Sequence, residues 1–248
     1  MPEWYEEMFD SDYIQVYSEQ DKRTSEDTDG IIDLISPTKD MKILDLCCGH
    51  GRHSLELARR GYNVTGYDLS DVLLGYAREK AKKGNLKVEF IEGDVRDLDY
   101  NEKFDIVLNL FTSFGYFDDE ENEEILNKIN RALVPGGRLL IQAANFSGVI
   151  RKADPDNSAV VFEGEGVTVV DDHKWNIENN ILHAKRRLFF EDGKRRDYSF
   201  YIRIYTLAEI LKMLNNAGME PIDYYSTLQG DAFDYQSMHY VVIAEKTP

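Results

Sequence analysis

The feature that most constrains the fold is the segment 43–52 (ILDLCCGHGR), an apolar run that ends in an acidic residue and two closely spaced glycines. Glycine tolerates a positive φ and lets the backbone approach a ligand, so Gly49 and Gly51 fit a sharp turn from a strand into a helix. Two further apolar runs also end in acidic residues, at Asp68 and Asp94. The carboxyl ends of successive parallel strands meet at one edge of an open α/β sheet, where such folds bind nucleotide-like ligands. The pattern therefore predicts three carboxylates around one crevice.

The chemistry of these positions favours a ligand that contains an amino acid, a ribose and an adenine. Asp45 lies just before the glycine turn, where it can meet a cationic amino group directly or through water. Asp68 can accept both ribose hydroxyls, and Asp94 with the following Val95 can contact the exocyclic amine and one face of the adenine. S-adenosylmethionine contains all three parts, and we predict it as the cofactor.

Two alternatives fit the glycine turn alone. A nicotinamide or flavin site would need the G-x-G-x-x-G fingerprint, whose third glycine allows close packing of helix on strand. Ser54 occupies that position, and Asp45 would repel a pyrophosphate. A tight turn with no ligand would not explain why carboxylates end three successive runs.

Composition and charge limit the classes of protein to which this chain can belong. A chain of 248 residues with 42% hydrophobic residues is long enough for one folded enzyme domain with an elaboration. No apolar run approaches the roughly eighteen residues of a membrane span, and the acidic, aromatic N-terminus is unlike a signal peptide, so we expect a cytoplasmic protein with no membrane contact. The formal net charge of −17 argues against DNA or bulk RNA as substrate, because nucleic-acid binding depends on lysine and arginine.

The two cysteines are adjacent, at Cys47 and Cys48. This arrangement offers neither a disulfide framework nor a C-x-x-C metal site, and we expect no metal. Both thiols are expected to serve as small packing groups in the glycine turn.

Alternating periodicity predicts the order of the elements. Residues 1–25 are expected to form a helical arm with aromatic residues on one face, and a polar stretch, 20–30, is expected to lead into a helix ended by Pro37. Strands alternate with helices up to Ala144, which indicates a parallel sheet. The expected strands of this part are 42–46, 63–67, 88–94, 104–110 and 138–142.

After Ala144 the pattern changes to strands without helices. Segments 159–162, 167–170, 181–190 and 198–204 are separated by glycine-containing turns and predict an inserted antiparallel meander. Thr206 and Glu209 then form a capping box that opens a helix. Strands at 220–225 and 239–245 are expected to complete the first sheet. The resulting division is a helical arm (1–38), a cofactor-binding core (39–148), an inserted sheet that covers the substrate (149–205) and a C-terminal part that completes the core (206–248).

Segments 43–53, 64–70, 93–94 and 133–141 together resemble the successive motifs of class I S-adenosylmethionine-dependent methyltransferases. The resemblance covers residues from about 40 to 145. It implies a Rossmann-like α/β fold with a seven-stranded sheet, the last strand antiparallel, and helices on both faces. It also implies methyl transfer by in-line displacement at the sulfonium carbon.

The spacing and the resemblance together define the candidate cofactor-binding residues. In related methyltransferases an N-terminal arm often covers the cofactor, with a tyrosine near the sulfonium or the amino-acid tail, and Tyr17 is the candidate here. The full set is Asp45, Cys47, Gly49, Gly51, Asp68, Leu69, Asp94, Val95, Leu110 and Tyr17.

The segment 109–117, after the fourth strand, is expected beside the transferred methyl group. It lacks the Asn/Asp-Pro-Pro-Tyr/Phe motif of enzymes that methylate bases or amide side chains. Its stretch 112–116 (TSFGY) is similar to small-molecule N-methyltransferases, including those acting on amino sugars and glycine. We therefore expect a small-molecule acceptor, methylated on nitrogen or oxygen, and a monomer or homodimer. An RNA-modifying methyltransferase and a non-catalytic, cofactor-binding regulator are the alternatives.

The residues that would catalyse transfer are not determined by the sequence. Candidates for a general base are Tyr116, His239, His173 and His183. The expected inserted sheet also contains a basic cluster within 185–196, followed by Arg203. This cluster is either a solvated hairpin face or a site for an anionic substrate group, and strand alternation would turn only half of it toward the core.

Overall fold

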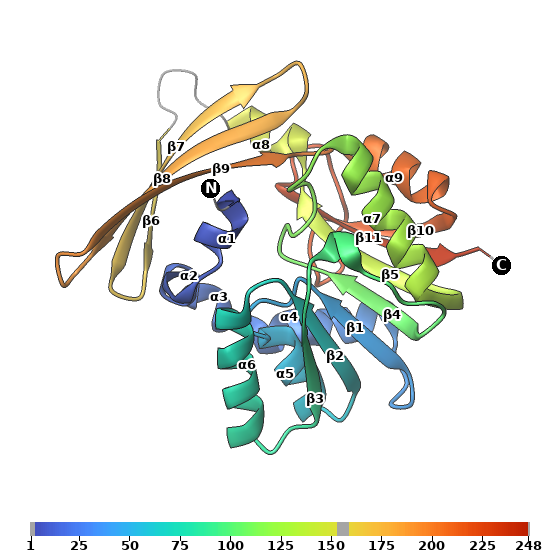
Figure 1. Cartoon of the computed structure of the whole chain (residues 1–248). Helices are drawn as coiled ribbons and strands as arrows, with labels where there is room; N and C mark the ends of the chain where they lie inside the picture. The colour runs from blue at the N-terminus through green and yellow to red at the C-terminus, as the bar shows by residue number, and fades with distance from the viewer. Residues whose placement is uncertain (1–2, 153–158, 248) are drawn as a thin grey trace.

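The computed structural model describes residues 3–152 and 159–247 (Figure 1). Residues 1–2, 153–158 and 248, which fall in the expected arm, inserted sheet and C-terminal part, lie outside the described residues. The larger sheet has seven strands in the order β10-β11-β5-β4-β1-β2-β3. Its strands are β1 (Lys42–Leu46), β2 (Asn63–Asp68), β3 (Val88–Glu92), β4 (Phe104–Asn109), β5 (Leu133–Ala144), β10 (Met219–Tyr225) and β11 (His239–Lys246). The last strand, β11, runs antiparallel to both β5 and β10, as predicted.

Helices cover both faces of this sheet because apolar side chains alternate along its strands. Leu44 and Leu46 of β1 belong to the apolar cluster under α7 (Asp119–Ala132) and α9 (Leu207–Asn216). Ile43 faces the other way, into the cluster under α4 (Thr24–Ile35) and α5 (Arg52–Arg59). Helix α6 (Asp71–Lys83) packs beside β3, and a short 3-10 helix, η1 (Val95–Asp97), follows that strand. The capping box predicted at the start of α9 is present.

The second sheet is the predicted antiparallel meander, in the order β6-β7-β8-β9. Its strands are β6 (Ala159–Gly164), β7 (Val167–Asn176), β8 (Ile181–Phe190) and β9 (Arg195–Arg203). The strand β7 extends six residues beyond the predicted end at 170, because its charged second half still pairs with β8. A helix that the sequence did not predict, α8 (Phe146–Lys152), lies between the two sheets along the chain.

The N-terminal arm lies between the two sheets (Figure 1) and is not one continuous helix. It consists of α1 (Trp4–Met8), α2 (Ser11–Val16) and α3 (Ser18–Asp21). Asp10 separates the first two by capping α2, since its side chain accepts the N–H of Asp12 at 2.9 Å. Met8 and Val16 pack with apolar residues of β7, β8 and β9 and thereby attach the arm to the smaller sheet.

The helix α4 begins at Thr24, and α3 ends at Asp21, so most of the polar stretch 20–30 that was expected to lead into this helix is itself helical. Gly30 lies inside this helix, where an added Cβ would stand 2.1 Å from the carbonyl oxygen of Leu228. The glycine therefore allows α4 to pack closely against the segment between β10 and β11. Among the described residues, no helix is long and apolar enough to cross a membrane.

Candidate cofactor and substrate site

A crevice with a cavity volume of about 70 Å³ opens at the carboxyl ends of β1 and β2 and before η1. It brings together six of the residues predicted to bind the cofactor. These are Cys47, Gly49, Asp68, Leu69, Asp94 and Val95. Tyr5, Phe9 and Tyr13 of the arm line the same crevice, so the arm covers it.

Asp68 is fixed at the end of β2 by two backbone groups. Its Oδ2 accepts the N–H of Gly49 at 2.7 Å, and its Oδ1 accepts the N–H of Ser70 at 2.9 Å. Burial raises the pKa of this carboxyl, although both hydrogen bonds favour the charged form. Each carboxylate oxygen has a second lone pair, so Asp68 can still accept ligand hydroxyls.

Asp94 caps η1 and forms an ion pair with Arg96, whose Nη2 lies 2.7 Å from its Oδ2. Burial disfavours the charged form, but the hydrogen bonds from Arg96 outweigh it and lower the pKa of Asp94. The guanidinium of Arg96 stacks over Phe117 at 4.5 Å and donates to the Tyr5 hydroxyl at 2.8 Å. Arg96 thus links this wall of the crevice to the arm, a role for which the sequence carried no signal.

A second, smaller cavity of about 40 Å³ lies at the glycine turn and is lined by Asp45, Leu110 and Arg52. Asp45 is 3% exposed and accepts a hydrogen bond from the Ser54 hydroxyl. Burial raises the pKa of its carboxyl, so a ligand ammonium would restore favourable interactions for the charged form.

Gly51 lines neither cavity. It has φ 73°, and a Cβ added there would stand 2.9 Å from the ring of Phe90. The second glycine of the motif is therefore required by packing of the turn against β3, whereas Gly49 lines both cavities.

The residues around these two cavities fit the predicted cofactor. A buried carboxylate beside an arginine suits a zwitterionic amino-acid tail, and Asp68 suits a ribose. Leu69 and Val95 supply apolar side chains where an adenine is expected.

A third cavity, of about 460 Å³, adjoins the other two and is called the chamber below. It is enclosed by the arm, by the inner face of the smaller sheet and by the segments after β4 and β10. The candidates Tyr17, Tyr116, His173 and His239 all line it. His183 does not, because it lies on the opposite face of β8, where its ring is 6.1 Å from that of Tyr201.

Tyr13 and Tyr116 line both the crevice and the chamber, which places their rings where the two cavities meet. Burial raises the pKa of both phenols well above the ordinary value, so both remain protonated at neutral pH. Burial has the opposite effect on a cationic acid and lowers the pKa of His173, which keeps its imidazole neutral.

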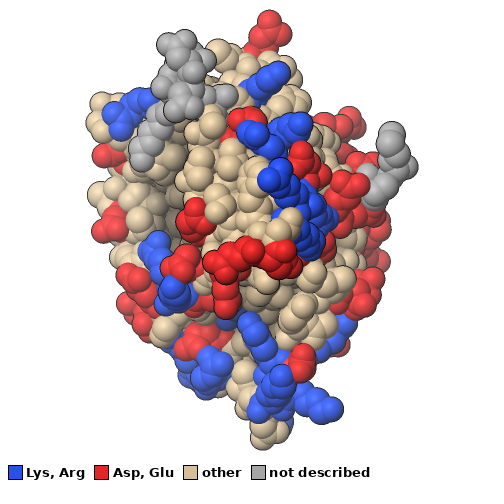
Figure 2. All heavy atoms as spheres, turned by 90° about the vertical axis from the view of Figure 1, so that its left-hand side faces the viewer, with Lys and Arg blue, Asp and Glu red and all other residues tan. Residues whose placement is uncertain are grey.

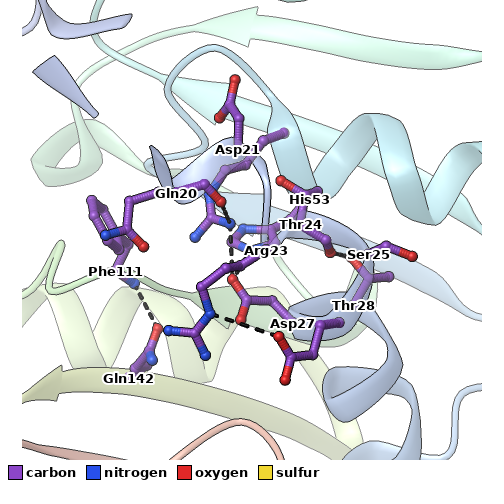
Figure 3. A network of polar contacts seen from close by, with 12 residues as sticks. Gln20, Asp21, Arg23, Thr24, Ser25, Asp27, Thr28, His53, Phe111 and Gln142 are labelled. Carbon is purple, nitrogen blue, oxygen red and sulfur yellow. Dashed lines mark hydrogen bonds and ion pairs between the residues drawn. The ribbon is translucent and has the colours of Figure 1, made fainter. Parts of the chain in front are cut away.

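One end of the chamber is polar, and its side chains come from α3, from α4 and the segment before it, from the start of α5 and from β5. Figure 3 shows Gln20, Arg23 and Asp27 on the side that faces Phe111 and Gln142. Within this network Arg52 donates to Asp27 at 2.9 Å and to the backbone oxygen of Gln20 at 3.2 Å.

The basic cluster is largely neutralised by nearby carboxylates. On the face at the left of Figure 1, Lys and Arg side chains are interleaved with Asp and Glu (Figure 2). Lys194 and Arg196 pair with Asp12, at 2.9 and 3.1 Å, which attaches α2 to the β8–β9 hairpin. Of the cluster, Arg186 lines the chamber, as strand alternation predicts for an inward position.

Sequence reasoning missed Asp171, Arg52 and Gln142 as chamber residues. The sequence did contain a signal for Asp171 and its ion-pair partner Arg186. Arg186 interrupts an otherwise apolar alternation of Leu182, Ala184 and Leu188. No such signal marks Gln142, whose place depends on the arrangement of β5 beside β4.

Comparison with known proteins supports the same cofactor chemistry. A family described as a methyltransferase domain matches residues 43–137. The chain is 24% identical to the glycine/sarcosine N-methyltransferase of Halorhodospira halochloris over 231 residues, 91% of this chain and 83% of that protein.

Two solved structures share the fold. An S-adenosylmethionine-dependent methyltransferase from Clostridium acetobutylicum superposes with a TM-score of 0.81 at 19% identity, over 95% of this chain and 96% of that one. The amino pentose methyltransferase CalS10 from Micromonospora echinaspora, solved with S-adenosylmethionine bound, gives 0.65 at 22% identity, over 91% of each chain.

Proposed function

We propose that this chain, a class I S-adenosylmethionine-dependent methyltransferase, transfers a methyl group to a nitrogen or oxygen atom of a small molecule. The observation that carries the proposal is the chamber, whose volume of about 460 Å³ lies within the usual range of small-ligand sites. It meets the cofactor crevice at Tyr13 and Tyr116. A small acceptor in the chamber would therefore stand beside the predicted position of the methyl group.

The acceptors in the names of the related proteins support this class. One relative is named for glycine and sarcosine, and one structural neighbour for an amino pentose. The charge of −17 and the paired state of the basic cluster do not favour an RNA backbone as ligand.

The residues that line the cavities position the cofactor and the acceptor in different ways. S-adenosylmethionine, when bound, supplies a methyl group on a sulfonium that is already activated. Asp45 would hold the amino group of the cofactor's amino-acid tail, and Asp68 would hold its ribose hydroxyls. The rings of Tyr13 and Tyr116 restrict where an acceptor can stand, so that positioning provides much of the rate. Both phenols stay protonated, which suits them to donate hydrogen bonds but not to act as bases. The neutral imidazole of His173 is suited to receive a proton from the acceptor.

The test is turnover of S-adenosylmethionine to S-adenosylhomocysteine with a panel of small amines and alcohols. Calorimetric titration with S-adenosylhomocysteine, and with NADH as control, first establishes an intact cofactor site. Product formation with a small acceptor is the expected result. Tight binding without turnover on any panel member or on a metabolite extract would indicate a regulator, and an acceptor destroyed by nuclease would indicate RNA.

A further inference from the structure

One ion pair is buried in the apolar inner face of the smaller sheet. Arg186 of β8 and Asp171 of β7 are opposite one another in register, and their side chains are 4% and 5% exposed. The Nε and Nη2 atoms of Arg186 donate to the two carboxylate oxygens at 2.7 and 2.6 Å. Such a pair adds little stability over apolar residues of the same size, which favours a role beyond folding.

The pair presents hydrogen-bond donors to the chamber, because both residues line it. A guanidinium has five N–H groups. Asp171 takes two, Tyr17 accepts a third from Nη1 at 2.8 Å, and Tyr198 is close enough to take another. At least one N–H therefore remains for a ligand. Since the Tyr17 hydroxyl accepts from Arg186, its own proton is also available to donate.

Aromatic rings hold the guanidinium in place. Its central carbon lies 5.1 Å from the ring of Phe200, 5.5 Å from that of Tyr17 and 5.6 Å from that of Phe162. A donor fixed in this way loses little freedom when it binds an anion.

The described residues that line the chamber include three guanidinium groups and two carboxylates. Arg186 pairs with Asp171 and Arg52 pairs with Asp27, while Arg23 pairs with Glu26 outside the chamber. The donors that remain on Arg186 and Tyr17 suit the two oxygens of one carboxylate.

We infer that the acceptor is a small carboxylic acid whose carboxylate binds Arg186 and Tyr17, while its nucleophilic nitrogen or oxygen extends toward Tyr13 and Tyr116. This inference rests on the proposed function and adds the chemical class of the substrate. Asp171 acts as a positioning residue, since it orients the guanidinium without contacting the ligand.

The experiment compares acids with their neutral amides. Turnover is measured for glycine, alanine and phenylalanine, for the corresponding amino-acid amides, and for glucosamine as an amine without a carboxyl group. We expect the acids to exceed their amides in kcat/KM by about 10- to 100-fold, the scale of losing charge-assisted hydrogen bonds. Turnover that favours the amides or glucosamine would overturn the inference and leave the proposed function standing.

Variants test the residues themselves. The double variant Asp171→Leu/Arg186→Leu removes both charges, so no unpaired charge stays buried. We expect it to raise KM for the acids by about 10- to 100-fold and to bring the ratio of acid to amide kcat/KM close to 1, with S-adenosylhomocysteine affinity unchanged. The matched control is Arg187→Gln, because Arg187 forms a similar 2.6 Å pair with Asp172 on the outer face. An equal loss for acids and amides would assign the pair a structural role only.

If no panel member is methylated, a binding measurement tests the carboxylate site separately from the proposed methyltransferase function. Benzoate and benzamide are titrated into the complex with S-adenosylhomocysteine, with ligand-observed NMR as the readout. Benzoate that binds the native protein but not the double variant supports the carboxylate site, although the panel then contradicts the proposed function. Equal binding of the two compounds would overturn the inference.

Discussion

At the scale of single residues, Asp68 tests the cofactor site most directly. Asp68→Ala should weaken S-adenosylhomocysteine binding by about 1–3 kcal/mol, the scale of losing hydrogen bonds to a charged acceptor. Calorimetric titration measures the change. Asp68→Asn separates ligand contact from support of the turn, because its amide oxygen can still accept the N–H of Gly49 or Ser70.

The control for this measurement is Asp71→Ala. Asp71 lies three residues further along, at the exposed start of α6, where it pairs with Arg78. Its loss should leave the affinity unchanged. An Asp68→Ala protein that folds and binds with native affinity would remove Asp68 from the site.

Gly51 of the motif and Gly61 at the end of α5 give a second prediction at this scale. Gly51→Ala combines a left-handed backbone with a Cβ pressed against Phe90, whereas Gly61 has φ 86° and open space around it. Gly61→Ala should therefore cost about 1–2 kcal/mol of folding free energy, the cost of the backbone conformation alone. Gly51→Ala should cost about 1–3 kcal/mol more, from overpacking. Chemical denaturation of both variants checks the order, and equal losses would contradict the packing argument.

At the scale of elements, ion pairs attach the arm to the smaller sheet. Asp12 of α2 is buried and accepts from Lys194 and Arg196, which also contacts Asp10. Asp12→Asn should make opening of the arm easier by about 1 kcal/mol, roughly a fivefold change in the opening equilibrium. Hydrogen exchange of α1 and α2 measures this opening. Glu19→Gln, in the exposed pair with Lys22, should have no effect.

A second contact joins α4 to the start of α5 and predicts a pH dependence. Burial opposes the charge on Asp27, but the hydrogen bond from Arg52 and the imidazole of His53, 3.7 Å away, lower its pKa to about 2. A carboxyl whose pKa is lowered by folding stabilises the protein above the ordinary value and loses that contribution as the pH falls. The contribution is about 2 kcal/mol for this shift, present above about pH 4 and lost toward pH 2.

Urea denaturation of the native protein and of Asp27→Asn measures this contribution. The difference between them should narrow as the pH falls from about 4 to 2. Asp29→Asn, in an exposed ion pair on the same helix, is the control. A difference that widens in acid would contradict the assignment.

The elements that the sequence predicted best are those whose apolar pattern reaches both ends of the element. The strand β8 begins and ends where its alternation does, at Ile181–Phe190. The second half of β7 was missed because charged residues interrupt its pattern, although cross-strand pairing continues to Asn176. In the arm, the aromatic stripe predicted a helix but not the break at Asp10, where a side-chain cap competes with helix continuation.

In the candidate site, too, residues that follow a local sequence pattern were predicted, and residues that depend on distant contacts were missed. Strand-end carboxylates were predictable because topology brings strand ends together, whereas Arg96 and Arg52 act through contacts between distant segments. Tyr17 was predicted near the cofactor, but it lines the chamber and pairs with Arg186, a partner 169 positions away.

At the scale of the whole molecule, the cofactor crevice depends on the larger sheet and also on the arm, which packs on the smaller sheet. Two apolar clusters pack the faces of the larger sheet, and a third packs the arm against the smaller sheet. The crevice is lined by residues at the strand ends of the larger sheet and is covered by the arm. A ligand there should therefore stabilise the arm and the core together.

Thermal unfolding tests this coupling. At a concentration of S-adenosylhomocysteine about 100 times its Kd, binding adds about 2.7 kcal/mol to the folded state. For a chain of this length that is a rise in Tm of roughly 5–10 °C, and NADH should cause none. We expect one transition that moves as a whole. Two transitions of which one moves would show that the arm and the smaller sheet unfold separately from the core, and the ligand would then owe its affinity to the strand ends alone.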